Sequence, residues 1–305
     1  MKRAVSISLG SSTRDKAVEI NILGETVSIE RIGTNGDFNK AVAMYQELDG
    51  KVDCFGVGGA LLGFMVANTW RPMHSVLPLI KNVHHTPVVD GTGLKMTLEN
   101  KITKVVNEAL PGYIKEKRAF IAAGLDRWGT SKALIDDGYE CVFGDAMFAL
   151  NWNLPIRDEK SLVRLANTLL PIVTRLPFSW IYPLGEKQLE REPKYSDYFE
   201  WATVVAGDCH YLWRHMPDRL PDRLVITNTT TTSDQEFFKS AGIKYLVTTT
   251  PIIDGRSFGT NMIEAAIIAA LGRKEPVDYG NPGVYFELMK ETIEQIPLSP
   301  EIKEL

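Results

Sequence analysis

Short apolar segments alternate with helical ones through the second half of the chain, and this alternation limits the possible folds more than any other feature. Apolar runs too short for helices occupy residues 119–123, 140–143, 203–206, 224–227 and 245–248. The segments between them carry helical spacing or helix-ending glycines. Strands that are apolar on both faces and alternate with helices form parallel sheets covered on both sides. The sequence therefore predicts an α/β fold with a Rossmann-like parallel sheet in its C-terminal part.

The first half of the chain predicts a smaller α/β domain. Its expected elements are a strand over 3–9, a β-hairpin formed by 17–21 and 26–32, and helices over 37–48, 60–83 (two stretches) and 94–109. We place the domain boundary in the charged stretch 115–118. Residues 1–115 then form an N-terminal substrate domain, and residues 116–305 form a nucleotide-binding domain.

Composition excludes several classes of protein. The chain has 305 residues, a formal net charge of −4 and no cluster of Lys or Arg, which argues against nucleic acid as the main partner. Its three cysteines are far apart and suit a reducing cytoplasm, and no apolar run is long enough for a membrane span. The histidines and cysteines lack the spacing of a metal site. We expect a cytoplasmic protein that acts on a small molecule, and a homodimer is compatible with the sequence.

The segment 119–145 carries the strongest signal for a cofactor. A strand leads into Gly124, a helix begins at Gly129, and Asp145 ends the next strand 21 positions after Gly124. This spacing is typical of a carboxylate that binds an adenosine ribose, and the start of the helix offers amides to an anion. The middle glycine of the usual fingerprint is replaced by Asp126, whose charge Arg127 could offset. Three alternatives stay open: another path of the loop, a ligand with fewer phosphates, or a βαβ unit without a nucleotide.

Polar residues follow two later strands of the same predicted sheet. Asn228, Thr229 and Thr230 come after one strand, and Thr249 comes after the next. Loops at the carboxyl ends of parallel strands bind ligands in open α/β sheets. These residues are therefore predicted to contact the cofactor. Ser233 and Glu236 predict a capping box for a helix over 234–241.

Two further loops are candidates for the substrate site and for catalysis. Arg256, Ser257 and Asn261 lie in a glycine-containing loop before an apolar helix, and Arg256 could clamp a carboxylate. Asp90 and Lys95 lie at a strand-to-helix turn, where a buried lysine can act as a proton donor.

The order of the domains and several motifs resemble the shikimate/quinate dehydrogenase family, and most closely its bacterial members labelled quinate 5-dehydrogenase. The motifs are Ser-Leu-Gly-Ser-Ser, Val-Asp-Gly-Thr-Gly-Leu-Lys, Gly-Arg-Ser-Phe-Gly-Thr-Asn and the Asn-Thr-Thr strand end. The resemblance implies a catalytic pair of a lysine and an aspartate. Lys95 is the position most similar to the lysine, and Asp126 is the candidate for the aspartate.

Three functions are compatible with these observations. The first is an NAD(P)-dependent oxidoreductase that acts on a small hydroxylated or carboxylated substrate, with NAD favoured because Asp145 would repel a 2′-phosphate. The second is an S-adenosylmethionine-dependent methyltransferase-like enzyme, since that cofactor has a ribose but no pyrophosphate. The third is a non-catalytic protein that binds a small molecule.

Overall fold

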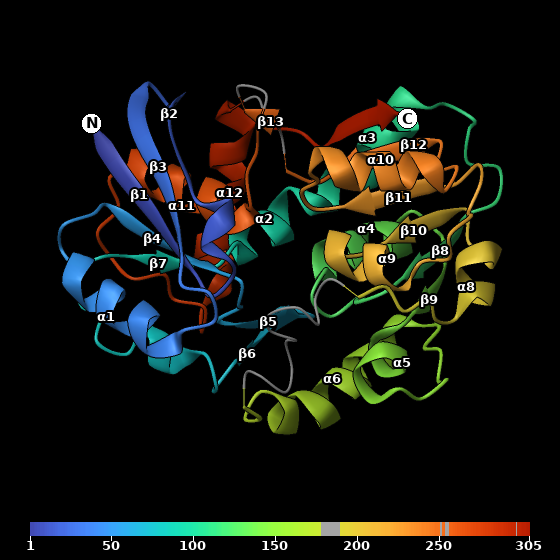
Figure 1. Ribbon diagram of the computed structural model, residues 1–305, viewed down its shortest axis with the longest axis horizontal. Coiled ribbons are helices and arrows are strands. Elements are labelled where there is room, and N and C mark those ends of the chain that lie inside the picture. The colour runs from blue at the N-terminus through green and yellow to red at the C-terminus, as the bar shows by residue number, and fades with distance from the viewer. Residues whose placement is uncertain (178–189, 251, 254–255, 297) are drawn as a thin grey trace. The chain divides into compact units, whose positions relative to one another are not determined.

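The chain folds into two compact α/β units. The computed structural model describes residues 1–177, 190–250, 252–253, 256–296 and 298–305 (Figure 1). For residues 252–253 and 256–257 it describes only the backbone. Unit 1 comprises residues 1–94, 170–185 and 258–297, and unit 2 comprises residues 95–169, 186–257 and 298–305. The predicted α/β class is confirmed. The units differ from the predicted segments 1–115 and 116–305, because residues 258–297 pack against the first strands of the chain.

Unit 1 is built on a five-stranded sheet in the order β2-β3-β1-β4-β7. Its strands are β1 (Lys2–Ser8), β2 (Lys16–Ile22), β3 (Glu25–Gly33), β4 (Cys54–Gly58) and β7 (Val88–Val89). Neighbours are parallel except β2 and β3, which form the predicted antiparallel hairpin. Leu23 and Gly24 turn this hairpin with φ angles of 52° and 78°. Two positive φ values in a two-residue turn match the twist of the strands on either side.

Helix α11 (Thr260–Ala270) packs on β1, β3 and β4 of unit 1, so the blue strands and the orange helix lie together in Figure 1. Most of its residues are apolar, and the residues from Met262 to Ala269 are buried. Gly56 allows the close approach, because a Cβ there would lie 2.9 Å from the carbonyl oxygen of Asn261. The other helices assigned to unit 1 are α1 (Phe38–Leu48), α12 (Pro282–Gln295) and the short 3₁₀ turns Ser12–Arg14 and Leu77–Leu79.

The predicted pair of helical stretches over 60–83 is wrong. The chain forms a second hairpin there, from β5 (Gly63–Val66) and β6 (Thr69–Pro72). Its turn residues Ala67 and Asn68 have φ angles of 49° and 59°. Asn is common in this left-handed conformation but Ala is not, so the sequence carries only half of the usual turn signal.

Unit 2 is built on a six-stranded sheet in the order β15-β12-β11-β10-β8-β9. Its strands are β8 (Arg118–Ile121), β9 (Glu140–Phe143), β10 (Val204–Ala206), β11 (Leu224–Thr227), β12 (Tyr245–Thr248) and β15 (Glu301–Glu304). All neighbours are parallel except β12 and β15. Counted along the chain, the parallel strands run 2-1-3-4-5, an order known from doubly wound sheets. The order reverses between β8 and β10.

Helices connect the strands of unit 2. They are α3 (Ile102–Ala109), α4 (Trp128–Asp136), α5 (Asp145–Leu150), α8 (Ser196–Trp201), α9 (Cys209–His215) and α10 (Thr232–Ser240). The chain passes between the units within α2 (Thr92–Thr97) and α6 (Glu159–Val173). The predicted helix over 94–109 is broken by a 3₁₀ turn over Glu99–Lys101. The capping box lies at Thr231 and Asp234 instead of Ser233 and Glu236, so α10 begins earlier than predicted.

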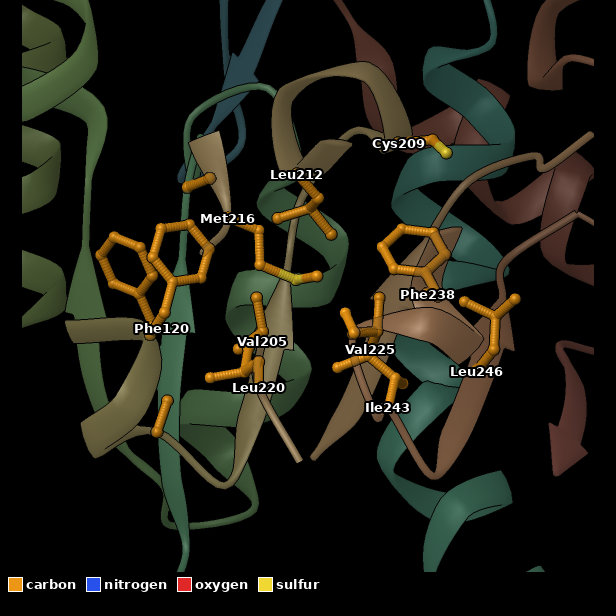
Figure 2. Packing of buried hydrophobic residues seen from close by; sticks show 14 of the residues in the cluster. Phe120, Val205, Cys209, Leu212, Met216, Leu220, Val225, Phe238, Ile243 and Leu246 are labelled. Atoms are coloured by element: carbon orange, nitrogen blue, oxygen red, sulfur yellow. The ribbon is translucent and has the colours of Figure 1, made fainter. Parts of the chain in front are cut away.

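Apolar side chains fill the space between the sheet of unit 2 and its helices. In Figure 2, Phe120, Val205 and Val225 from neighbouring strands meet Leu212 and Met216 from the region of α9. All of them are buried. Two short strands, β13 (Ile252–Ile253) and β14 (Arg256–Ser257), pair with each other in antiparallel orientation. Within the described part of the chain, no helix is both long and apolar enough to cross a membrane.

A buried carboxyl group links two segments of unit 1. Glu264 on α11 accepts hydrogen bonds from the backbone amide of Leu94 (3.0 Å) and from the hydroxyl of Tyr285 (2.6 Å). Burial, together with the nearby carboxylate of Asp90, raises the pKa of Glu264 to about 8. The side chain therefore holds its proton near neutral pH.

The variant Glu264→Gln is expected to remove a pH dependence of stability. The folded state keeps a proton that the unfolded state releases above its ordinary pKa of 4.5, so wild-type stability falls as the pH rises from about 4.5 to about 8. In thermal melts, the melting temperature of Glu264→Gln minus that of the wild type should rise by roughly 5 °C between pH 5 and pH 9. The exposed control Glu291→Gln should track the wild type. A constant difference between Glu264→Gln and wild type would contradict the expectation.

Candidate functional site

At one place in the sheet of unit 2, the connections that follow two neighbouring parallel strands lead in opposite directions along the sheet. It lies at the carboxyl ends of β8 and β10, which are adjacent although β9 comes between them in the chain. Residues 122–127 follow β8, and Gly207 and Asp208 follow β10. In open α/β sheets this reversal opens a crevice in which ligands bind. The strands β8, β10, β11 and β12 all end on the same side of this sheet, which we call the carboxyl edge.

Lys95 and Asp126 form an ion pair at the carboxyl edge. The Lys95 Nζ lies 2.8 Å from the Asp126 Oδ1, and their side chains are 8% and 23% exposed. Burial would raise the pKa of Asp126, but Lys95 and Arg127 outweigh burial and hold it below its ordinary value. Asp126 is therefore a carboxylate at neutral pH, and part of it reaches the surface of the unit.

Arg127 is surrounded by carboxylates. Its Nη1 lies 2.8 Å from Glu99, its Nη2 lies 3.3 Å from Asp208, and its Nε lies 3.4 Å from Asp126. The side chain is buried. Burial alone would lower the pKa of Arg127, but the three carboxylates raise it above its ordinary value. With Lys95 included, three carboxylates face two cations.

The partners of Arg127 have further hydrogen bonds of their own. Glu99 is fully buried and accepts bonds from the hydroxyls of Thr130 (2.9 Å) and Thr249 (3.4 Å). Asp208 accepts a bond from the Asn228 side-chain amide (2.7 Å) and caps the start of α9. The Asn228 side-chain oxygen in turn accepts the backbone amide of Cys209 (3.1 Å). The network therefore joins the loops after β8, β10, β11 and β12.

Asp145 contacts the turn after β8, where the sequence has a dinucleotide-binding fingerprint with Asp126 in place of the middle glycine. Its carboxylate accepts the backbone amides of Gly124 and Leu125, each at 2.9 Å. Burial raises the pKa of Asp145 to about 6, although these two bonds lower it. Because the protein's own carboxylate takes both amides, the pyrophosphate of a dinucleotide does not fit this turn. A carboxylate can accept about four hydrogen bonds, so capacity remains for a ribose hydroxyl.

The two glycines of the turn are required by packing inside unit 2. A Cβ at Gly124 would lie 2.6 Å from the Phe143 ring, and a Cβ at Gly129 would lie 1.8 Å from the carbonyl oxygen of Lys95. The start of α4 thus lies so close to the backbone at Lys95 that a Cβ at Gly129 does not fit. This packing against Lys95 gives a structural reason for the glycine at 129, which the sequence had assigned to the cofactor.

Two family models together match nearly the whole chain. Residues 93–305 match the family described as "Domain of unknown function (DUF8754)", and residues 3–90 match "Domain of unknown function (DUF8753)". This chain belongs to the DUF8754 family. None of the curated proteins matches it. The expected resemblance to quinate and shikimate dehydrogenases stays a prediction.

Solved structures similar to the DUF8754 chain include malic enzymes and sugar-binding proteins. An NAD-dependent malic enzyme from Thermotoga maritima is 12% identical, with 91% of this chain and 73% of that chain covered and a TM-score of 0.40. The Entamoeba histolytica malic enzyme is 9% identical, with 96% and 76% covered and a TM-score of 0.34. A galactofuranose-binding protein is 10% identical, with 99% and 94% covered and a TM-score of 0.34. Scores this low carry no argument about activity, so the architecture rests on the strand order given above.

Most of the predicted site residues come together in unit 2 of the DUF8754 chain. The interactions described above join Lys95, Gly124, Asp126, Arg127, Gly129, Asp145, Asn228 and Thr249. Thr229 and Thr230 follow Asn228 directly, and the Thr230 hydroxyl accepts a bond from Gln235 (3.1 Å). The side chains of Arg256 and Ser257 lie outside the described residues.

Asp90 and Asn261 belong to unit 1. Asp90 is buried and accepts the backbone amides of Leu62 (2.7 Å) and Thr92 (3.0 Å). Asn261 donates to the hydroxyl of Ser6 at 2.6 Å. Both side chains hold neighbouring segments of unit 1 together.

Glu99 and Asp208 are members of the network that sequence reasoning missed. Glu99 stands among helical residues and gives no local signal. Asp208 does carry one, because Gly207-Asp208 follows a strand in the same way as Gly144-Asp145. Among the described residues, no group of three or more His, Cys, Asp or Glu side chains could hold a metal ion.

The variant Gly129→Ala is expected to destabilise the protein by at least about 2 kcal/mol, because its Cβ would overlap a backbone oxygen that cannot rotate away. Urea unfolding measures the loss. Gly283→Ala is a matched control, since Gly283 also lies in the first turn of a helix and a Cβ there meets nothing within 4 Å. Equal stability of the two variants would contradict the close crossing at Lys95.

Proposed function

We propose that this DUF8754 protein is an enzyme that transfers a proton to or from a hydroxyl or carbonyl oxygen of a small substrate at the carboxyl edge of unit 2. The ion pair of Lys95 and Asp126, with its 2.8 Å separation, carries the proposal. It lies where the strand order reverses, and its carboxylate is partly exposed. Alcohol oxidation by an NAD(P)-dependent oxidoreductase is the reaction of this class that the dehydrogenase resemblance implies.

The chemistry of the pair follows from its charges. Asp126 stays ionised because Lys95 and Arg127 lower its pKa, so it can orient the ammonium group toward an incoming oxygen. An ammonium group in a mostly buried position can donate a proton to a developing alkoxide and take one back in the reverse direction. Arg127 and Glu99 hold Asp126 in place and do not themselves reach the surface.

The cofactor of such a reaction would be held by its adenosine part. Asp145 offers lone pairs to a ribose, and both NAD and S-adenosylmethionine contain this group. The resemblance of the Lys95 and Asp126 pair to a dehydrogenase favours NAD, whose pyrophosphate would have to lie outside the turn at Gly124 and Leu125. One observation favours S-adenosylmethionine and a methyltransferase-like second candidate: Asp145 fills the place of the pyrophosphate, which that cofactor lacks.

The variant Lys95→Met is expected to lower turnover about 100-fold or more without unfolding the protein, because the proton donor of the reaction is lost. Turnover is measured by the absorbance of reduced nicotinamide with a panel of polyols and hydroxy acids. Lys132→Met is the matched control, since Lys132 forms an ion pair with Asp136 on the outer face of α4. Activity that survives Lys95→Met would contradict the assignment of the proton donor.

A thermal-shift titration with NAD, NADP and S-adenosylmethionine identifies the cofactor. A ligand at a hundredfold excess over its dissociation constant stabilises the folded state by about 2.7 kcal/mol. We expect an adenosine-containing ligand to raise the melting temperature, and Asp145→Ala but not Asp136→Ala to abolish the shift. A shift with NAD larger than with NADP supports the oxidoreductase, and one with S-adenosylmethionine alone supports the second candidate. No shift with any of the three would contradict an adenosine site.

A further inference from the structure

Helix α2 is too short to be stable by itself, and buried carboxyl groups hold its first turn. The helix has six residues, and an isolated helix of this length is not stable in water. The first amides of any helix have no partner within it. In α2 the amide of Thr92 is bonded to Asp90 at 3.0 Å, and the amide of Leu94 is bonded to Glu264 at 3.0 Å. The geometry of α2 therefore depends on these two carboxyl groups.

Glu264 reaches α2 from a helix that is distant in the sequence. It lies on α11, 170 positions after Leu94, and its side chain is fully buried. The backbone amide of Gly93 also donates to it. Because the Tyr285 hydroxyl bonds to its other oxygen at 2.6 Å, the carboxyl group is fixed from two sides.

The glycines of the segment Val-Asp-Gly-Thr-Gly-Leu-Lys are explained by this contact with α11. A Cβ at Gly91 would lie 2.5 Å from the hydroxyl oxygen of Thr260, the first residue of α11. A Cβ at Gly93 would lie 2.9 Å from the Tyr285 ring. Gly91 also has a φ angle of 95°, which favours glycine. This part of the motif therefore brings the start of α2 against α11.

We propose that Glu264 is a positioning residue, which fixes the backbone of α2 and thereby the ammonium group of Lys95. Lys95 is the next residue after Leu94 and belongs to the same helix. The inference rests on the proposed function in taking Lys95 as the proton donor. A proton donor must lie within hydrogen-bond reach of the reacting oxygen, so a shift of the helix slows the proton transfer. Glu264 is fully buried and acts only through α2.

Chemical labelling of Lys95 tests the proposal without knowledge of the substrate. Acetic anhydride at pH 7 acylates lysines: the neutral nitrogen attacks a carbonyl carbon, an amide bond forms, acetate leaves, and the buffer takes the proton. Mass spectrometry of peptides gives the rate at Lys95 relative to Lys132 in the same chain. The Lys95 side chain is 8% exposed and paired with Asp126, whereas that of Lys132 is 38% exposed. The labelling ratio therefore reports how often the Lys95 segment opens.

The variant Glu264→Leu keeps an apolar side chain in place of the carboxyl group but offers no acceptor. It is expected to raise the labelling ratio at least about fivefold, because a buried amide left without a partner shifts an opening equilibrium by this factor or more. Glu264→Gln should leave the ratio close to the wild-type value. Its amide oxygen can accept the Leu94 N–H, and it is neutral like the carboxyl group that Glu264 carries near neutral pH.

Ile29→Ala is the matched control for a general loss of stability. It truncates a buried side chain of β3 and removes no hydrogen bond of α2. An opening of the whole protein would raise the labelling ratio in Ile29→Ala as well, whereas a local role of Glu264 leaves it near the wild-type value.

Turnover connects the labelling to the reaction. Glu264→Leu should lower kcat roughly tenfold or more with little change in KM, because a misplaced proton donor slows the chemical step and leaves binding in place. Glu264→Gln should restore kcat. A full kcat in Glu264→Leu together with a raised labelling ratio would contradict the positioning role.

An unchanged labelling ratio in Glu264→Leu overturns the proposal, and so does an equal rise in Glu264→Gln or Ile29→Ala. If Glu264→Leu does not fold, Glu264→Asp decides in its place, since its carboxyl group is one methylene short of α2 and should also raise the ratio. Turnover that survives Lys95→Met would contradict the proposed function and leave the labelling ratios as they are. An unchanged ratio, in contrast, contradicts the role of Glu264 and leaves Lys95 as the proton donor.

Discussion

The guanidinium of Arg127 connects the charged residues of the candidate site through ion pairs. It contacts three carboxylates that come from the segment before β8, from the turn after β8 and from the loop after β10. Removing one partner of a buried charge pair typically costs about 3–5 kcal/mol, because the other charge is left without compensation. The positions of Glu99, Asp126 and Asp208 are therefore coupled. Through Asp126 this coupling reaches Lys95, and through Asp208 it reaches Asn228.

Unit 2 has the strand order of doubly wound sheets, but the residues expected to bind a cofactor there bind one another. The strand order and the spacing from Gly124 to Asp145 are those expected of a cofactor domain. The residues at these positions nevertheless satisfy one another: an aspartate replaces the phosphate, and an arginine neutralises carboxylates of its own chain. Fold and spacing therefore predicted which residues come together better than they predicted the partners of those residues.

The sequence predicted those features that depend on local patterns. The strand over 245–248 and the hairpin of β2 and β3 were confirmed, because apolar runs between turn residues define such elements. The hairpin of β5 and β6 was missed, since Ala67 gives no sign of a left-handed turn. The partners of Arg127 could not be read from the sequence either. They lie 28 and 81 positions away, and nothing local relates Glu99 to Asp208.

The burial of α11 has a consequence for the order in which the chain becomes structured during synthesis. The strands of unit 1 leave the ribosome first, yet the helix that packs on β1, β3 and β4 begins only at Thr260. Domains generally fold as units, in the order in which they are translated. Unit 1 must wait with part of its apolar surface uncovered while the intervening residues of unit 2 are made. The nascent strands of unit 1 therefore expose apolar surface until α11 has been synthesised.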